Sequence, residues 1–193
     1  ALAAPDGAIL HVVTRTGSSR SESWQLQAPP YDQRVVTVGA DGRPGRELGT
    51  KDGRPEVWNP LTNTVHVLAT GAIAPPDRGE DVAGERLVEG MRDLLRSGQA
   101  HEDGRVTVDS REGIRIVSDV DSRVLVVDAG SYRPIEWTLT SDDGTVLTTR
   151  IEAYESLPAT EANLGLLDVR AHHPDAAVVA DGTVSNDGMP GKK

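Results

Sequence analysis

The chain has 193 residues and a formal net charge of −10, which fits one acidic domain with its own hydrophobic core. The acidic balance disfavours nucleic acid and anionic membrane surfaces as partners, because both attract clustered Lys and Arg. With no cysteine, the chain can form neither disulfides nor thiolate metal sites.

The chain begins Ala1-Leu2-Ala3-Ala4, without an initiator Met. Such a start is typical of a chain from which a targeting or membrane segment has been removed, so we expect one to have preceded Ala1. Within the sequence, no apolar run approaches the roughly 18–20 residues of a membrane-spanning helix.

Alternation of apolar and polar residues between turn signals predicts a series of strands. The expected strands are residues 8–15, 22–27, 33–40, 46–50, 56–58, 64–69, 105–109 and 113–118, followed by three more within residues 124–158. Asp-Gly pairs, which favour two-residue hairpins, mark four expected strand junctions: Asp41-Gly42, Asp52-Gly53, Asp103-Gly104 and Asp143-Gly144. This spacing predicts an antiparallel meander.

One long helix is expected at residues 81–97, between the two blocks of strands. Asp81 and Glu85 lie early and Arg92 and Arg96 late, as the helix dipole favours, and Gly98 ends the helix. Its apolar stripe consists of Val82, Leu87, Val88, Met91, Leu94 and Leu95.

After the last strand, Thr160 is expected to cap a short helix. Residues 1–179 are interpreted as a single domain and residues 180–193 as a flexible C-terminal tail. The fold class is therefore mainly β (α+β): an open half-barrel, or curled antiparallel sheet, of about ten strands with one main amphipathic helix over its concave face.

Signals for catalysis or metal binding are weak. His11 and His66 could meet across the sheet, but structural histidines are commoner there, and the adjacent His172 and His173 would point opposite ways on an extended chain. The sequence holds no nucleophile-elbow, dinucleotide or phosphate-loop motif. We therefore expect no enzyme, no cofactor and no metal site.

A half-barrel has more concave surface than one helix can fill, so an apolar cavity is geometrically plausible. Ordinary core packing is the alternative for the same residues. The candidate cavity residues are Trp24, Leu26, Val36, Val38, Trp58, Val65, Val67, Leu87, Met91, Leu94, Leu125, Val127, Trp137 and Leu139.

Several short strand-and-turn motifs of this chain form a familiar set. They are Gly7-Ala8-Ile9-Leu10-His11-Val12, Glu22-Ser23-Trp24, Asn59-Pro60 with Asn63-Thr64-Val65, Val127-Asp128, Ser131-Tyr132-Arg133-Pro134-Ile135-Glu136-Trp137, Tyr154-Glu155-Ser156-Leu157-Pro158 and His173-Pro174-Asp175-Ala176. Together they resemble the LolA/LppX superfamily and the N-terminal domain of the periplasmic regulator RseB, in particular actinobacterial relatives associated with anti-sigma factors. The resemblance covers most of residues 8–179.

The resemblance implies a half-barrel without catalytic residues, located outside the cytoplasm in the cell envelope or secreted, and open to membrane tethering through a segment before Ala1. It also implies two alternative roles. One is a binding module for a lipid, a lipoprotein acyl chain or another apolar ligand. The other is an envelope-stress sensor or protein-interaction domain with a filled core, whose partner is an anti-sigma factor or another envelope protein. The sequence leaves open the ligand, the partner and the oligomeric state.

Overall fold

The computed structural model describes residues 7–69 and 83–180, and these form a single 12-stranded sheet. The strands before the helix are β1 (Ile9–Thr16), β2 (Ser19–Leu26), β3 (Gln33–Val38), β4 (Pro44–Lys51), β5 (Arg54–Asn59) and β6 (Thr64–Val67). After helix α1 (Ala83–Ser97) follow β7 (Ala100–Val108), β8 (Arg111–Ser118), β9 (Arg123–Asp128), β10 (Pro134–Thr140), β11 (Val146–Leu157), α2 (Glu161–Leu164), η1 (Gly165–Leu167), α3 (Val169–His172) and β12 (Ala177–Ala180).

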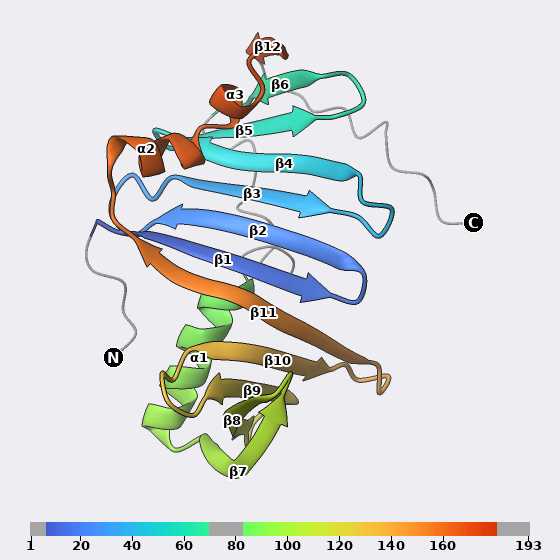
Figure 1. The fold of residues 1–193 in the computed structure, drawn as a ribbon, viewed down its shortest axis with the longest axis vertical. Helices are drawn as coiled ribbons and strands as arrows, with labels where there is room; N and C mark the ends of the chain where they lie inside the picture. The colour runs from blue at the N-terminus through green and yellow to red at the C-terminus, as the bar shows by residue number, and fades with distance from the viewer. Residues whose placement is uncertain (1–6, 70–82, 181–193) are drawn as a thin grey trace.

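Two antiparallel meanders, β1–β6 and β7–β11, make up most of the sheet. The sheet order is β12-β6-β5-β4-β3-β2-β1-β11-β10-β9-β8-β7, so the meanders join where β1 pairs with β11 (Figure 1). The short strand β12 pairs in parallel with β6 at one edge. The predicted open, curled antiparallel sheet with one main helix is confirmed.

The start of the second meander differs from the prediction. Asp103-Gly104 is not a strand junction but lies inside β7, where the register shifts between Glu102 and Arg105. The hairpin to β8 instead turns at Asp109 and Ser110, with φ of 46° and 66°. An Asp-Gly pair thus forms a bulge here, because Gly104 with φ of 83° also satisfies the bulge geometry.

Other differences concern strand ends and number. Strand β2 begins at Ser19, since Gly17 alone supplies the positive φ needed to turn from β1. The strands also exceed the expected ten, because residues 177–180 join the edge of β6. Ala180, expected in the tail, thus belongs to a strand, while residues 181–193 lie outside the described residues.

The hairpin between β10 and β11 forms at the expected Asp143-Gly144 pair. Asp143 accepts hydrogen bonds from the Ser141 hydroxyl and the Thr145 N–H. The hydrogen bond from Ser141 is the main cause that lowers the pKa of Asp143 to about 2. Its carboxylate therefore caps the turn.

Helix α1 lies on one face of the sheet, here called the α1 face, behind β10 and β11 in the view of Figure 1. Its side chains Val88 and Met91 are buried against residues of β1 and of the second meander. The cluster consists of Leu10, Val12, Val88, Met91, Ala100, Ile116, Leu125, Val127, Trp137 and Ile151. The helix stripe therefore covers the second meander and its junction with β1.

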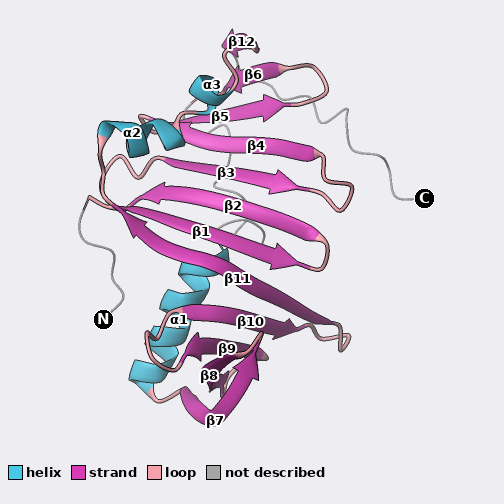
Figure 2. Cartoon of the chain, viewed as in Figure 1, coloured by secondary structure: helices cyan, strands magenta, loops and turns pink. Residues whose placement is uncertain are grey.

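The segment α2–η1–α3 lies on the opposite face, here called the cap face, in front of the first meander (Figure 2). We name residues 160–173 the C-terminal cap. Thr160 caps α2 as predicted by accepting the N–H of Asn163, and Asp168 caps α3 by accepting the N–H of Ala171. Leu167 and Val169 are the buried residues with which the cap docks.

The cap docks where β4 has no side chain. A Cβ added at Gly49 would lie 2.5 Å from Val169 Cγ2 and 3.0 Å from the Gln33 carbonyl oxygen. We expect Gly49→Ala to lower the free energy of unfolding by about 1–3 kcal/mol, because a side chain here overpacks a closed contact. Urea denaturation followed by circular dichroism measures the change.

Gly165→Ala is the matched control for this substitution. Its added Cβ meets nothing within 4 Å, and its φ of −59° suits alanine. This variant should be neutral or more stable by about 0.4–1 kcal/mol. Equal stability of the two variants would show that the cap does not rest on Gly49.

Candidate functional site

The apolar cluster beneath α1 contains the candidate cavity residues of the second meander. Leu125, Val127 and Trp137 lie on neighbouring strands β9 and β10, and cross-strand pairing places Trp137 directly opposite Leu125. Met91 is fully buried against them, and Leu94 is partly buried at the side of the cluster. The structure thus brings these five candidates together under the helix.

Two buried polar atoms, one on β10 and one in α1, lack a hydrogen-bond partner among the described residues. Trp137 is only 7% exposed, and its indole Nε1 is buried without a hydrogen bond to any described residue. In α1, the Nη2 atom of Arg92 is likewise buried and unpaired within the described part of the chain. A buried indole N–H ordinarily has an acceptor. The N–H of Trp137 finds none among the described residues, so it is free to donate a hydrogen bond to another molecule.

The candidates of the first meander lie on the other face of the sheet. Leu10 and Val12 contact the α1 cluster, so the intervening His11 points to the cap face. His11 pairs with Trp24 across β1 and β2, and paired residues point to the same side of a sheet. Continuing the register places the following candidates on the cap face: Trp24, Leu26, Val36, Val38, Trp58, Val65 and Val67.

The expected set of candidates therefore does not line one cavity. A single-residue step along a strand reverses the direction of the side chain, and alternation alone does not tell which face receives the helix. Of the two remaining candidates, Leu139 is 36% exposed near the hairpin end of β10, and the side chain of Leu87 lies outside the described residues. The proposed ligand role now concerns only the group under α1.

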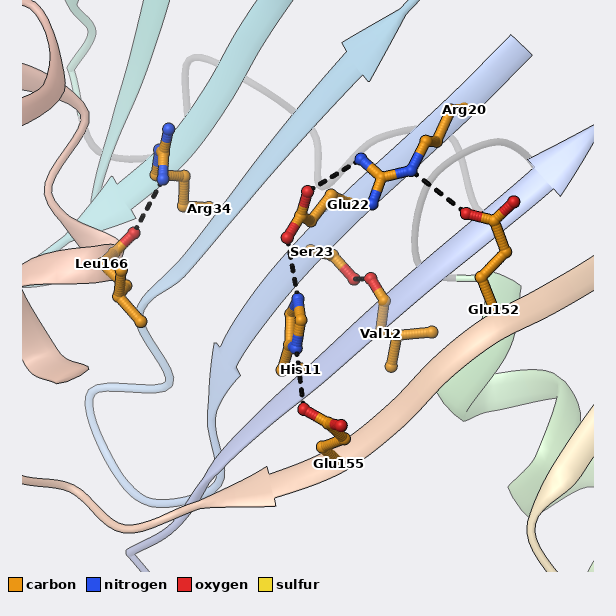
Figure 3. A network of polar contacts seen from close by, with 9 residues as sticks. All are labelled: His11, Val12, Arg20, Glu22, Ser23, Arg34, Glu152, Glu155 and Leu166. Carbon is orange, nitrogen blue, oxygen red and sulfur yellow. Dashed lines mark hydrogen bonds and ion pairs between the residues drawn. The ribbon is translucent and has the colours of Figure 1, made fainter. Parts of the chain in front are cut away.

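On the cap face, Trp24 lies between polar neighbours rather than in an apolar pocket. His11 stacks on it with ring centroids 5.2 Å apart, and the Arg34 guanidinium lies 4.9 Å from its ring centroid. His11 Nε2 is 2.9 Å from Glu22 Oε1, and His11 Nδ1 is 3.5 Å from Glu155 Oε2 (Figure 3). His11 is thereby held by two carboxylates from adjacent strands.

A buried charged cluster holds the C-terminal cap on the sheet. Arg34 Nε donates to Glu47 Oε1 at 2.5 Å, and Arg34 Nη1 donates to the carbonyl oxygen of Leu166 at 3.2 Å. His173 Nε2 lies 2.9 Å from Glu47 Oε2, and its ring stacks on Trp58 with centroids 3.8 Å apart. These contacts fasten the middle and the C-terminal end of the cap.

A second ion pair under the cap joins Arg170 to Glu56. Glu56 is 1% exposed, and its other oxygen, Oε2, has no hydrogen-bond partner among the described residues. Burial, followed by the charge of Arg34, lowers the pKa of the neighbouring His172. The cluster is therefore built to hold chain segments together.

Sequence reasoning did not identify this cluster. Arg34, Glu47 and Glu56 occupy strand positions that looked exposed, and only the placement of the cap buries them. The sequence offered one signal for them: the cross-strand pairing of Arg34 with Trp24 and of Glu47 with Trp58. The histidines His11 and His66, which could have met, point to opposite faces, since His66 pairs with Val57 and His11 with Trp24.

Within residues 7–69 and 83–180, no group of three His, Asp or Glu side chains is arranged to hold a metal ion. No helix in that part of the chain has both the length and the apolar character needed to span a bilayer. No protein-family model and no curated protein matches the chain.

Comparison with solved structures does find similar folds. An uncharacterised conserved protein from Thermus thermophilus aligns with a TM-score of 0.52 at 13% identity, over 91% of this chain and 91% of that chain. This similarity shows a shared fold.

Two weaker matches concern proteins with informative titles. The Pseudomonas aeruginosa MucA/MucB complex matches with a TM-score of 0.42 at 17% identity, over 84% of this chain and 55% of that chain. A LolA superfamily protein from Nitrosomonas europaea matches with a TM-score of 0.28 at 15% identity, over 82% of this chain and 81% of that chain.

Proposed function

We propose that this protein is a non-catalytic, extracytoplasmic binding module that holds an apolar ligand against the α1 face of β9, β10 and β11. The ligand class is a lipid, an acyl chain or a similar molecule, and α1 acts as the lid. The observation that carries the proposal is the buried Nε1–H of Trp137 in the apolar cluster, which has no acceptor in residues 7–69 and 83–180.

A buried donor without an acceptor costs about 1–3 kcal/mol. An ester carbonyl or carboxylate oxygen on an otherwise apolar ligand would accept this N–H, while the chain of the ligand contacts Leu125 and Val127. The unpaired Nη2 of Arg92 in α1 offers a second donor for such a head group. The site therefore suits a ligand with one polar end more than a plain hydrocarbon.

Ligand entry requires the helix to move. Val88 and Met91 are 3% and 0% exposed, so they occupy the space over the sheet that a ligand would take. An acyl chain that replaces this stripe recovers about 25 cal/mol for each Å² of apolar surface that it buries. On binding, the ligand thus replaces the side chains of α1 against the same strands.

The test is titration of the purified protein with oleic acid, read by tryptophan fluorescence and by calorimetry. We expect saturable binding, and we expect Trp137→Phe to weaken it about tenfold or more, as the loss of one hydrogen bond to a charged carboxylate predicts. Trp58→Phe is the matched control, because Trp58 lies on the cap face and should leave the affinity unchanged. Equal affinities of all three proteins would refute the role of Trp137.

The alternative is an envelope-stress sensor or protein-interaction domain with a filled core, whose partner is an anti-sigma factor or another envelope protein. The observation that favours it is the closure of the cluster, in which ten residues are at most 8% exposed without any ligand. On this alternative, oleic acid gives no saturable signal, and solvent extraction of the protein purified from its own cells yields no lipid. The immobilised protein then retains an envelope protein from extracts in the absence of detergent.

A further inference from the structure

A polar pocket of about 150 Å³ lies where the turn between β9 and β10 meets β11. Its charged lining comes from β8, β9, the β9–β10 turn and β11: Arg111, Asp128, Arg133, Glu152 and Glu155. Glu155 pairs with His11 across β11 and β1, which places this part of the pocket on the cap face. The pocket therefore opens on the cap face, while Ile151 and Tyr154 in its lining also belong to or pack against the cluster beneath α1.

Two of these side chains, Arg111 and Arg133, form no ion pair with any described residue. Most described arginines do contact a carboxylate, as Arg105, Arg115 and Arg150 do in the same meander. In a chain with a net charge of −10, carboxylates are abundant. Two unpaired guanidinium groups in one pocket therefore stand out from the rest of the surface.

Each acidic residue of the pocket contacts hydrogen-bond donors other than Arg111 and Arg133. The Asp128 carboxylate accepts hydrogen bonds from the N–H groups of Gly130 and Ser131 and from the Ser131 hydroxyl. These bonds, that from the Ser131 N–H first, lower the pKa of Asp128, and the charge of Arg111 lowers it further. Asp128 is thus anionic and bound into its own turn.

On β11, Glu152 is held by Arg15 and Arg20, with N–O distances of 2.6 Å and 3.1 Å. Figure 3 shows the bond from Arg20 to Glu152 and, beside it, the contact of Glu155 with His11. Both glutamates therefore face partners on β1 and β2. Glu152 is thus committed to two other arginines, whereas Glu155 contacts His11 at 3.5 Å and forms no ion pair with Arg111 or Arg133.

We propose that Arg111 and Arg133 form a binding site for a phosphate group. A guanidinium presents paired N–H donors that match the oxygens of a phosphate, and two guanidiniums balance a phosphate dianion. A carboxylate carries a single charge and would leave one of the two groups uncompensated. The site lies on the face opposite α1, so it does not depend on a ligand under the helix.

Calorimetric titration of the whole chain with inorganic phosphate at low ionic strength tests this site. We expect saturable binding that weakens about tenfold in Arg111→Gln and again in Arg133→Gln, as the loss of a charge-assisted hydrogen bond predicts. Arg46→Gln is the matched control, because Arg46 is an exposed arginine of β4 that forms no ion pair with a described residue. Its affinity should equal that of the wild type.

A wild type that binds phosphate no better than the double variant Arg111→Gln/Arg133→Gln overturns the proposal, as does an equal loss in Arg46→Gln. Circular dichroism melting of each variant separates loss of the site from loss of the fold. Flotation with vesicles of phosphatidic acid in phosphatidylcholine, whose phosphomonoester can carry two negative charges, then identifies the source. If the protein floats with the vesicles only when both arginines are present, the phosphate belongs to a lipid head group. If the protein binds inorganic phosphate but does not float with the vesicles, the ligand is a soluble anion.

Discussion

Arg34→Ala should lower the free energy of unfolding by about 3–5 kcal/mol, the cost of leaving a buried charge without its partner. The side chains of Arg34 and Glu47 are 8% and 4% exposed, so water cannot replace the lost guanidinium. His173 remains beside Glu47 but contacts its other oxygen. Urea denaturation of the variant and the wild type measures the difference.

The control for this prediction is Arg46→Ala, an exposed position on the neighbouring strand β4, where the change should stay within about 0.5 kcal/mol. A double variant separates the cost of an unpaired buried charge from the loss of packing at Arg34 and Glu47. Arg34→Met combined with Glu47→Leu should regain most of the loss, since an apolar pair needs no compensation. If Arg34→Ala is as stable as Arg46→Ala, the pair does not hold the cap.

Arg34 also bonds the cap backbone through the Leu166 carbonyl oxygen. The loss in Arg34→Ala should therefore be accompanied by faster amide hydrogen exchange in residues 161–172 than in the wild type. Exchange in β9 and β10, on the far side of the β1–β11 junction, should change only as much as the global stability does.

Met91→Ala is expected to destabilise the protein by about 2–5 kcal/mol, because it opens a cavity between α1 and the sheet. Met91 has no exposed surface and lies in the same cluster as Trp137. Leu95→Ala is the control on the same helix, since Leu95 is 39% exposed and should cost much less. Thermal and urea denaturation provide the measurement.

The same variant distinguishes the two functional hypotheses. If a ligand displaces α1, a weakened helix contact lowers the cost of displacement, and oleic acid should bind Met91→Ala more tightly than the wild type. Leu95→Ala should leave the affinity unchanged. A Met91→Ala protein that is folded, less stable and still unable to bind oleic acid supports a filled core instead.

Local patterns predicted the elements well where strand and turn signals agreed. The segment from Val124 to Pro158 contains β9, β10 and β11 as expected, with a loop ending at Pro134 and a hairpin at Asp143-Gly144. The helix was expected two residues earlier than its described start at Ala83, because Asp81 and Val82 continue its pattern. Residues 81 and 82 lie outside the described part of the chain.

Properties that depend on tertiary placement were beyond the sequence. Trp24 and Trp137 both looked like cavity residues, yet the register places them on opposite faces of the sheet. Glu56 reads as a surface strand residue and becomes 1% exposed only because Arg170 and the cap lie over it. The pocket at Arg111 and Arg133 combines positions from separate hairpins, which no local pattern relates.

The central junction of the sheet pairs the first strand with the last long one, Ile9 opposite Leu157. A chain synthesised from its N-terminus must therefore complete β1–β6 and α1 and extend through β11 before β1 gains its second neighbour. Until then, β1 presents a row of free backbone N–H and C=O groups, the kind of edge on which other chains aggregate. Contacts between residues far apart in the sequence also slow folding, so the edge of β1 stays unpaired for a long part of the folding process.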